Sequence, residues 1–143
     1  MRHHHAPVEI ARMLMQPMPY TAAADDHLLD AAERMTGHGV RHLPVVDGDQ
    51  HVLGMLSDGD VRAVIGDSAR ALNHHDAVVR VRSLRVDDAM TRDPFVVHDD
   101  TPFEEVVDVF TKQRVGAVPV IDARDRLVGI ISYVDVLKKA NAL

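Results

Sequence analysis

The sequence has no cysteine, which excludes disulfide bonds and zinc sites built on thiolates. A chain without cysteine is compatible with the reducing cytoplasm, which is its expected location. The N-terminal residues lack the apolar run of a secretion signal, and no stretch approaches the length of a membrane span. Lysine and arginine form no stripe and the net charge is −6, so we expect neither a membrane nor a nucleic acid among the partners.

The composition predicts a globular protein with a real hydrophobic core. The chain has 143 residues, about the length of one ordinary domain, and 46% of them are hydrophobic. A chain of this size buries roughly two-thirds of the surface that it exposes when unfolded. Composition alone says nothing more specific, so the function has to be sought in the pattern of residues.

A repeat runs through most of the chain. A shift of 75 residues aligns residues 15–65 with residues 90–140 without a gap. The identities cluster at turns and motif positions, and this regularity predicts two copies of one structural unit. The identical pairs are Met15/Met90, Pro19/Pro94, Asp25/Asp100, Thr36/Thr111, Val40/Val115, Pro44/Pro119, Val45/Val120, Asp47/Asp122, Gly54/Gly129, Ser57/Ser132, Asp60/Asp135 and Val61/Val136.

The strands of both repeats follow the same order. A short first strand is expected at residues 19–21 and at residues 94–97, each with proline at its start. Later in each repeat, LPVVDGDQHVLGML and VPVIDARDRLVGII read as two apolar strands around a polar turn, which is typical of a hairpin. A second helix is expected to begin near Ser57 and near Ser132. The unit is therefore β-α-β-β-α.

The first helix of each unit is predicted from its apolar spacing. Apolar residues recur at i, i+3, i+4 and i+7, which places them on one helical face. Asp25 or Asp26 in the first repeat, and Asp100 or Thr101 in the second, are expected to cap the N-terminus of this helix. The apolar positions are Leu28, Ala31, Ala32 and Met35, and then Phe103, Val106, Val107 and Phe110.

We expect a mixed α+β fold in which two pseudo-symmetric units pack through their sheets, because one unit of about 50 residues would bury only a thin core. The expected parts are an N-terminal tail and lead-in helix at 1–14, a first unit at 15–65, a linker at 66–89 and a second unit at 90–143. The cleft between the units is then the natural place for a ligand.

The phrase Gly-apolar-apolar-Ser-x-x-Asp occurs once in each unit, at residues 54–60 and 129–135. One interpretation is a capping box, in which serine and aspartate bond to each other's backbone at the start of a helix. The other is a ligand site, because a helix N-terminus offers free N–H groups to an anion and a carboxylate there suits the diol of a ribose. The two interpretations are compatible.

At this point the chain resembles a known family, the tandem CBS domain or Bateman module, named after cystathionine β-synthase. The resemblance rests on three paired motifs: the M-x-x-x-P leads at 15–19 and 90–94, the phrases LPVVD and VPVID, and the two Gly-apolar-apolar-Ser-x-x-Asp phrases. It covers nearly the whole chain. It implies a regulatory module that binds AMP, ADP, ATP or S-adenosylmethionine and passes the occupancy to another protein.

The resemblance also implies which residues bind the ligand. Asp60 and Asp135 are expected to hold a ribose in two separate sites, with Ser57 and Ser132 near the ribose or phosphate. In the Asp60 site, Arg41 and His42 take the place of the phosphate-binding residue. The adenine would lie against the opposite unit: against Thr101, Val115, Gly116 and Ala117 for the Asp60 site, and against the bulkier Asp26, Val40, Arg41 and His42 for the Asp135 site. We therefore predict two unequal sites, the better one built on Asp60.

Other chemistries are less well supported by the sequence. Neither DGDQ nor SDGD completes an EF-hand loop, no H-E-x-x-H spacing is present, and the pair His74–His75 is expected in solvated linker. His3, His4 and His5 are read as a disordered terminus or a cloning remnant. No G-x-S-x-G elbow surrounds Ser57 or Ser132. We therefore expect no metal site, no required cofactor and no enzymatic activity.

Two hypotheses follow. In the first, the chain senses an adenosine compound and acts in trans on an unidentified effector protein, because no catalytic or transport domain is visible in the sequence. In the second, it is a structural or interaction module whose ligand sites are vestigial. Under either hypothesis the family resemblance implies a homodimer, to which residues 8–15 would add apolar surface.

Overall fold

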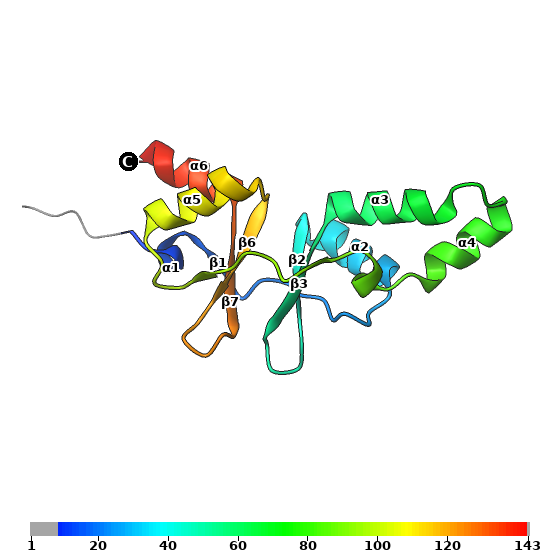
Figure 1. Cartoon of the computed structure of the whole chain (residues 1–143), viewed down its shortest axis with the longest axis horizontal. Helices are drawn as coiled ribbons and strands as arrows, with labels where there is room; N and C mark the ends of the chain where they lie inside the picture. The colour runs from blue at the N-terminus through cyan, green and yellow to red at the C-terminus, as the bar shows by residue number, and fades with distance from the viewer. Residues whose placement is uncertain (1–8, 143) are drawn as a thin grey trace, which may run out of the picture. The chain divides into compact units, whose positions relative to one another are not determined.

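The computed structural model of the protein describes residues 9–142, so the expectation for His3, His4 and His5 lies outside the described part. The chain divides into two compact units, which are named for their positions along the sequence (Figure 1). The inner unit is residues 20–94, and the outer unit is formed by the flanking segments, of which residues 9–19 and 95–142 are described. The elements are α1 (Ala11–Leu14), β1 (Gln16–Pro17), α2 (Leu28–His38), β2 (His42–Val46), β3 (Val52–Ser57), α3 (Asp58–Ala69), α4 (His74–Ser83), the 3₁₀ helix η1 (Val86–Asp88), β4 (Thr91–Arg92), β5 (Val97–His98), α5 (Phe103–Gln113), β6 (Ala117–Ile121), β7 (Leu127–Ser132) and α6 (Tyr133–Ala142).

The sheet of the inner unit is built on the antiparallel hairpin β2–β3, in which His42 lies opposite Ser57. The short strand β4 adds to the other edge of β3, also antiparallel. At the outer edge of β2 a single parallel bridge joins Ala22 to Val45. The short strand expected at residues 19–21 is therefore reduced to this one bridge at Ala22.

The outer unit repeats this arrangement 75 residues later. Its sheet has the order β1-β7-β6-β5, in which β6–β7 is an antiparallel hairpin and β5 runs parallel to β6. The pair Val97–Val120 in β5 and β6 corresponds to the bridge Ala22–Val45 of the inner unit. The β-α-β-β-α order and the mixed α+β fold are therefore confirmed.

The lead segments are exchanged between the repeats. Strand β1 lies at the start of the first repeat but pairs with β7 of the second, and β4 lies at the start of the second repeat but pairs with β3 of the first. Each exchanged lead brings a methionine onto a glycine of the recurring phrase, Met15 onto Gly129 and Met90 onto Gly54. The expected division into 1–14, 15–65, 66–89 and 90–143 follows the repeats in the sequence. It stays a prediction, because the compact units have other bounds: each contains the lead segment of the other repeat.

Each unit has its own core, formed where the predicted apolar helical face meets the sheet. Leu28, Ala31 and Met35 are buried in the inner unit, and Val106 is buried in the outer unit with Phe103 packed beside it. The buried inner core comprises Ala22, Leu28, Ala31, Met35, Leu43, Val45, Leu56, Val61, Leu84 and Val86. The buried outer core comprises Ala11, Leu14, Val97, Val106, Val118, Val120, Ile131 and Val136.

The expected caps of the first helices are wrong. The N-cap residues are His27 for α2 and Pro102 for α5, and neither makes a side-chain cap. Asp26 instead accepts a hydrogen bond from Ala23 N at 2.9 Å, and Thr101 Oγ1 accepts one from His98 N at 3.0 Å. Both side chains bond backward and close the turn before the helix, because short polar side chains cap turns as readily as helices.

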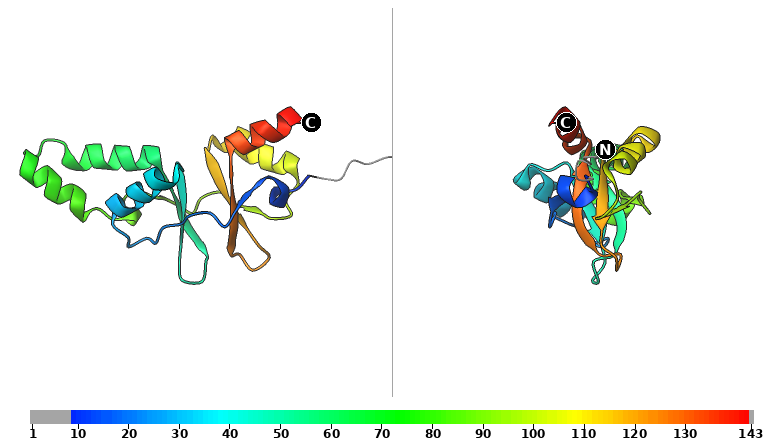
Figure 2. Two further views of the ribbon diagram at one scale, coloured as in Figure 1. Left: turned by 180° about the vertical axis from the view of Figure 1, so that it is seen from behind. Right: turned by 90° about the vertical axis from the view of Figure 1, so that its left-hand side faces the viewer.

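The connecting stretch contains more regular structure than a linker implies. Helix α3 runs on to Ala69, and α4 then folds back beside it, as Figure 1 and the left view of Figure 2 show. Asn73 begins α4 by accepting a hydrogen bond from Asp76 N at 2.8 Å. His74 and His75 lie exposed at the start of α4. Within residues 9–142, no helix has both the length and the apolar character needed to cross a membrane.

Candidate functional site

Ser57 and Asp60 form a closed pair where β3 ends and α3 begins. Ser57 Oγ accepts a hydrogen bond from Asp60 N at 3.0 Å, and Asp60 Oδ2 accepts one from Ser57 N at 3.3 Å. This reciprocal pair is a capping box, which satisfies two backbone N–H groups that the first turn of a helix leaves without partners. The capping interpretation of the phrase is confirmed in the inner unit.

Ser132 and Asp135 form the matching pair where β7 ends and α6 begins. Asp135 Oδ2 accepts hydrogen bonds from Ser132 N at 2.9 Å and from Ser132 Oγ at 3.1 Å. Asp135 N donates back to Ser132 Oγ at 3.3 Å. Both copies of the phrase therefore hold their carboxylate in the first turn of the second helix.

Each junction is also tied to the strand beside it. Asp58 N donates to the carbonyl oxygen of Arg41 at 2.9 Å, and Tyr133 N donates to that of Gly116 at 3.0 Å. Arg41 and Gly116 precede β2 and β6, so the residues expected at the phosphate or adenine lie beside the Ser–Asp pair of their own unit. The same backbone contact thus places a guanidinium beside the Ser–Asp pair of the inner unit, at Arg41, and no side chain at the matching Gly116 of the outer unit.

The two aspartates differ in the hydrogen bonding of Oδ1, the carboxylate oxygen that takes no part in the capping bonds. In the described chain, Asp60 Oδ1 has no hydrogen-bond partner, and the Asp60 side chain is half-buried. Asp135 Oδ1 accepts a hydrogen bond from Gln16 Nε2 at 3.4 Å. A carboxylate oxygen with no protein partner can accept a hydroxyl proton from a ligand. Asp60 Oδ1 is therefore open to a ligand, whereas Asp135 Oδ1 already accepts a hydrogen bond from Gln16.

His42 is the first residue of β2 and lies half-buried opposite Ser57. Burial lowers the pKa of His42, the negative charge of Asp60 partly opposes this, and the adjacent Arg41 lowers the pKa further. The imidazole is therefore neutral at pH 7 and offers one N–H rather than a positive charge. Arg41, which is exposed, carries the fixed positive charge at this place.

The lowered pKa of His42 has a consequence for stability. Because the unfolded chain binds a proton at His42 more readily than the folded one, acidification from pH 7.5 through 6.5 favours unfolding. We expect urea unfolding midpoints of the wild type to fall more steeply over pH 7.5 to 5.5 than those of His42→Gln, which removes this group. Equal slopes for the two proteins would contradict the burial of a neutral imidazole.

The residues expected to contact adenine are divided between the two units. For the Asp60 site they all belong to the outer unit: Val115 and Gly116 are half-buried, Ala117 begins β6 opposite Ser132, and Thr101 closes its turn before α5. For the Asp135 site they belong to the inner unit, where they are Asp26, Val40, Arg41 and His42. The structure brings together Arg41, His42, Ser57 and Asp60 within one unit, and Gly116, Ala117, Ser132 and Asp135 within the other. The combination of residues from both units stays a prediction.

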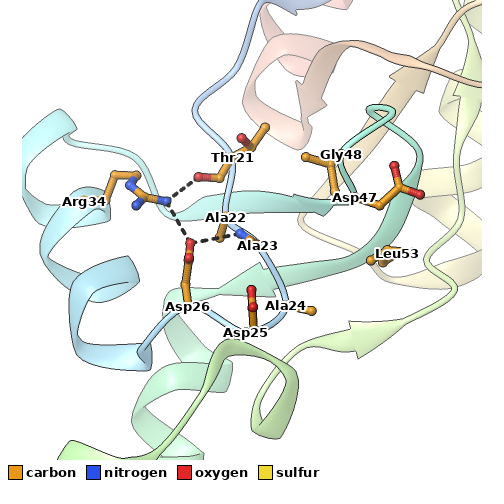
Figure 3. A pocket seen from close by; sticks show the side chains of 11 residues that line it. Thr21, Ala22, Ala23, Ala24, Asp25, Asp26, Arg34, Asp47, Gly48 and Leu53 are labelled. Carbon is orange, nitrogen blue, oxygen red and sulfur yellow. Dashed lines mark hydrogen bonds and ion pairs between the residues drawn. The ribbon is translucent and has the colours of Figure 1, made fainter.

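An open pocket of about 620 Å³ lies in the inner unit (Figure 3), and neither Ser57 nor Asp60 lines it. Arg34 reaches over it, donates to the carbonyl oxygen of Thr21 and lies 3.6 Å from Asp26 Oδ2. Asp25 and Asp47 also line this pocket, so its carboxylates outnumber its single cation. This charge disfavours a phosphate group, and the expected adenine contact Asp26 is already engaged by Arg34.

Asp47, Asp49 and His51 lie close enough together to suggest a cation site. Asp47 Oδ1, however, accepts hydrogen bonds from Asp49 N and His51 N, both at 2.9 Å. Asp122 accepts the matching bonds from Arg124 N and Arg126 N in the outer hairpin, where these two arginines take the places of Asp49 and His51. Closure of the hairpin turn explains both aspartates, and the backbone bonds hold the pKa of each below its usual range.

Sequence reasoning missed two contacts of the candidate site. Gln16 reaches Asp135, and the sulfur atoms of Met15 and Met90 occupy the space left by Gly129 and Gly54. The glycine of the recurring phrase therefore makes room for a methionine. The methionine leads were visible in the sequence, but their partners were not, because each lead packs on the other repeat.

Comparisons with known proteins agree with this architecture. The CBS domain family model matches residues 9–67 and residues 86–142. The chain is 27% identical over 128 residues to a CBS domain-containing protein of Dictyostelium discoideum, an alignment that spans 90% of this chain and 88% of that protein. It is 29% identical over 119 residues to inosine-5′-monophosphate dehydrogenase of Methanocaldococcus jannaschii, spanning 83% of this chain but only 21% of the enzyme.

The fold is similar to that of CBSX2 from Arabidopsis thaliana, which was crystallised in complex with AMP. The TM-score is 0.77 at 25% identity, and the match covers 93% of this chain and 96% of that chain. The likeness therefore extends over both units. With the family model matched twice, over most of both repeats, this chain belongs to the CBS domain family and contains a tandem pair of CBS domains.

Proposed function

We propose that the protein is a regulatory module that binds an adenosine-containing ligand (AMP, ADP, ATP or S-adenosylmethionine) with residues from both CBS domains. The observation that carries this proposal is the Asp60 carboxylate, which is held by Ser57 through one oxygen while the other has no partner among residues 9–142. Such a carboxylate suits the 2′ and 3′ hydroxyls of a ribose, which donate hydrogen bonds and carry no charge. The AMP complex of the related CBSX2 protein supports the same ligand class.

The remaining groups of the proposed site follow from their charge and size. Arg41 would attract the phosphate, and His42 would donate a hydrogen bond or gain a proton beside it. Val115, Gly116 and Ala117 would face the adenine, since small residues leave room for a purine. Thr101 would lie at the edge of the base. Asp135 and Ser132 would form the second site. It would be weaker, because Gly116 and Ala117 stand where the first site has Arg41 and His42.

Ligand binding should raise the thermal stability of the protein. A ligand at 100 times its Kd stabilises the folded state by about 2.7 kcal/mol, which raises the Tm of a chain of this size by about 5–10 °C. We expect such a shift with at least one of AMP, ADP, ATP and S-adenosylmethionine in a thermal unfolding assay. Inosine serves as the matched control because it has the ribose but neither the phosphate nor the 6-amino group. No shift with any of the four ligands would contradict the proposal.

The output of such a module is a change in another protein. A ligand can shift the relative arrangement of two domains only through its different affinity for the two arrangements. We propose that the protein forms a homodimer, acts in the cytoplasm without enzymatic activity, and passes ligand occupancy to an effector in trans.

A second candidate function is a structural or interaction module whose ligand sites are vestigial. The observation that favours it is the surface of α6, where Tyr133 is 55% exposed and Leu137 is 60% exposed, with Val134 beside them. The matched positions on α3 are Asp58, Gly59 and Arg62, which present no apolar surface. An exposed apolar stripe on one of two equivalent helices is typical of a contact surface. This candidate predicts association with no response to nucleotides.

A further inference from the structure

We propose that Gln16 is a latch on the second ligand site: its amide binds the Asp135 carboxylate and lowers the affinity of that site for a ribose. This inference rests on the proposed function, because it concerns which of the two carboxylates accepts the ligand. Gln16 lies outside the recurring phrase, and its role would be to compete with a ligand for one oxygen atom.

The latch is built from the exchanged lead segment. Gln16 belongs to β1, lies opposite Ile130 of β7, and donates through Nε2 to Asp135 Oδ1 at 3.4 Å. Asp135 Oδ2 is already bound to Ser132 N and Ser132 Oγ. Asp135 Oδ2 thus accepts two hydrogen bonds and Oδ1 accepts one, which leaves a single lone pair, so a ribose that donates both of its hydroxyls would have to displace the amide of Gln16.

A second contact fastens the same lead segment to the same helix. Glu9 Oε1 lies 2.9 Å from Lys139 Nζ, one helical turn after Asp135, and both side chains are about a quarter exposed. Ala11 and Leu14 are buried in the outer core together with Val136. The segment is thereby held against α6 at both ends, which keeps Gln16 close to Asp135.

The inner unit provides the matched comparison. Thr91 takes the place of Gln16, since it lies opposite Met55 on β4 as Gln16 lies opposite Ile130 on β1. A threonine side chain is two heavy atoms shorter than glutamine, and no hydrogen bond joins Thr91 to Asp60 in the described chain. Asp60 Oδ1 is therefore left to the ligand. The latch explains the inequality of the sites by a residue that neither recurring phrase contains.

The test uses AMP and isothermal titration calorimetry on the full chain. In an Asp60→Ala background, which isolates the second site, Gln16→Ala is expected to tighten AMP binding about fivefold, the change that about 1 kcal/mol of displaced hydrogen bonding produces. Gln16→Met, which keeps the length but cannot donate, should tighten binding in the same way. A purely structural role for Gln16 would move Tm without tightening Kd.

The reciprocal variant is Thr91→Gln in an Asp135→Ala background, which places the amide beside Asp60 and should weaken AMP binding at the first site. Thr91→Ala in that background should leave Kd unchanged. If the wild type binds AMP but Gln16→Ala and Gln16→Met leave the affinity of the Asp60→Ala protein unchanged, the latch is wrong and the proposed function stands. If the wild type binds no AMP, the proposed function fails for this ligand and the latch fails with it.

Discussion

Asp60→Ala is expected to remove most of the thermal stabilisation that AMP gives to the wild type and to weaken AMP binding more than tenfold. The substitution deletes the carboxylate that we propose as acceptor for the ribose hydroxyls. Hydrogen bonds to a charged group contribute about 1.5–3 kcal/mol each, so the loss of even one exceeds the 1.4 kcal/mol of a tenfold change. Thermal unfolding with and without AMP, followed by calorimetric titration, measures the effect.

The matched control is Asp135→Ala. This variant also loses its helix capping box, so both proteins should be destabilised without ligand by about 1 kcal/mol. The AMP response should separate them, with Asp135→Ala weakening binding only about threefold or less on the scale of a single shared hydrogen bond. Equal losses of AMP affinity in the two variants would show that the two sites are equivalent and would refute the predicted inequality.

Gly54→Ala is expected to destabilise the protein by about 1–3 kcal/mol through overpacking. A Cβ atom at Gly54 would lie 2.7 Å from the sulfur of Met90 and 2.8 Å from the backbone oxygen of Thr91. The methionine side chain can move, but the oxygen belongs to β4, whose pairing with β3 fixes it. Urea unfolding of Gly54→Ala against the wild type measures the cost, and the change should lie in the midpoint.

Gly48→Ala provides the comparison for this prediction. Gly48 lies in the β2–β3 hairpin turn, where an added Cβ would meet nothing within 4 Å. The same chemical change should there alter the free energy of unfolding by only about 0.5 kcal/mol or less. If Gly54→Ala were as stable as Gly48→Ala, the close packing of Met90 on β3 would be wrong.

Much of the architecture was predictable because it depends on local patterns. The helical spacing of Leu28, Ala31 and Met35 predicted the buried face of α2, and the polar turn between apolar runs predicted the hairpin β2–β3. Ser57 and Asp60 predicted a capping box, since the partners are only three residues apart. In each case the interacting groups are close neighbours in the sequence, so spacing alone specifies the contact.

Other local predictions failed because two geometries satisfy the same side chain. Asp26 and Thr101 can accept a hydrogen bond from a residue ahead of them or behind them. Both bond backward, to Ala23 N and His98 N, and their helices begin without a side-chain cap. The helical content of residues 66–83 was missed for a related reason, since α4 has no buried residue and therefore only a weak apolar pattern.

The duplicated β-α-β-β-α unit, with a serine and an aspartate at the start of each second helix, follows from residue order, because repeats and capping spacings are local properties of the chain. The exchange of the lead segments, by which Met15 packs on Gly129 and Gln16 reaches Asp135, follows from the fold and from no local spacing. These contacts join residues more than a hundred positions apart. Sheet pairing creates them, and no local pattern of residues encodes which repeat a short edge strand will join.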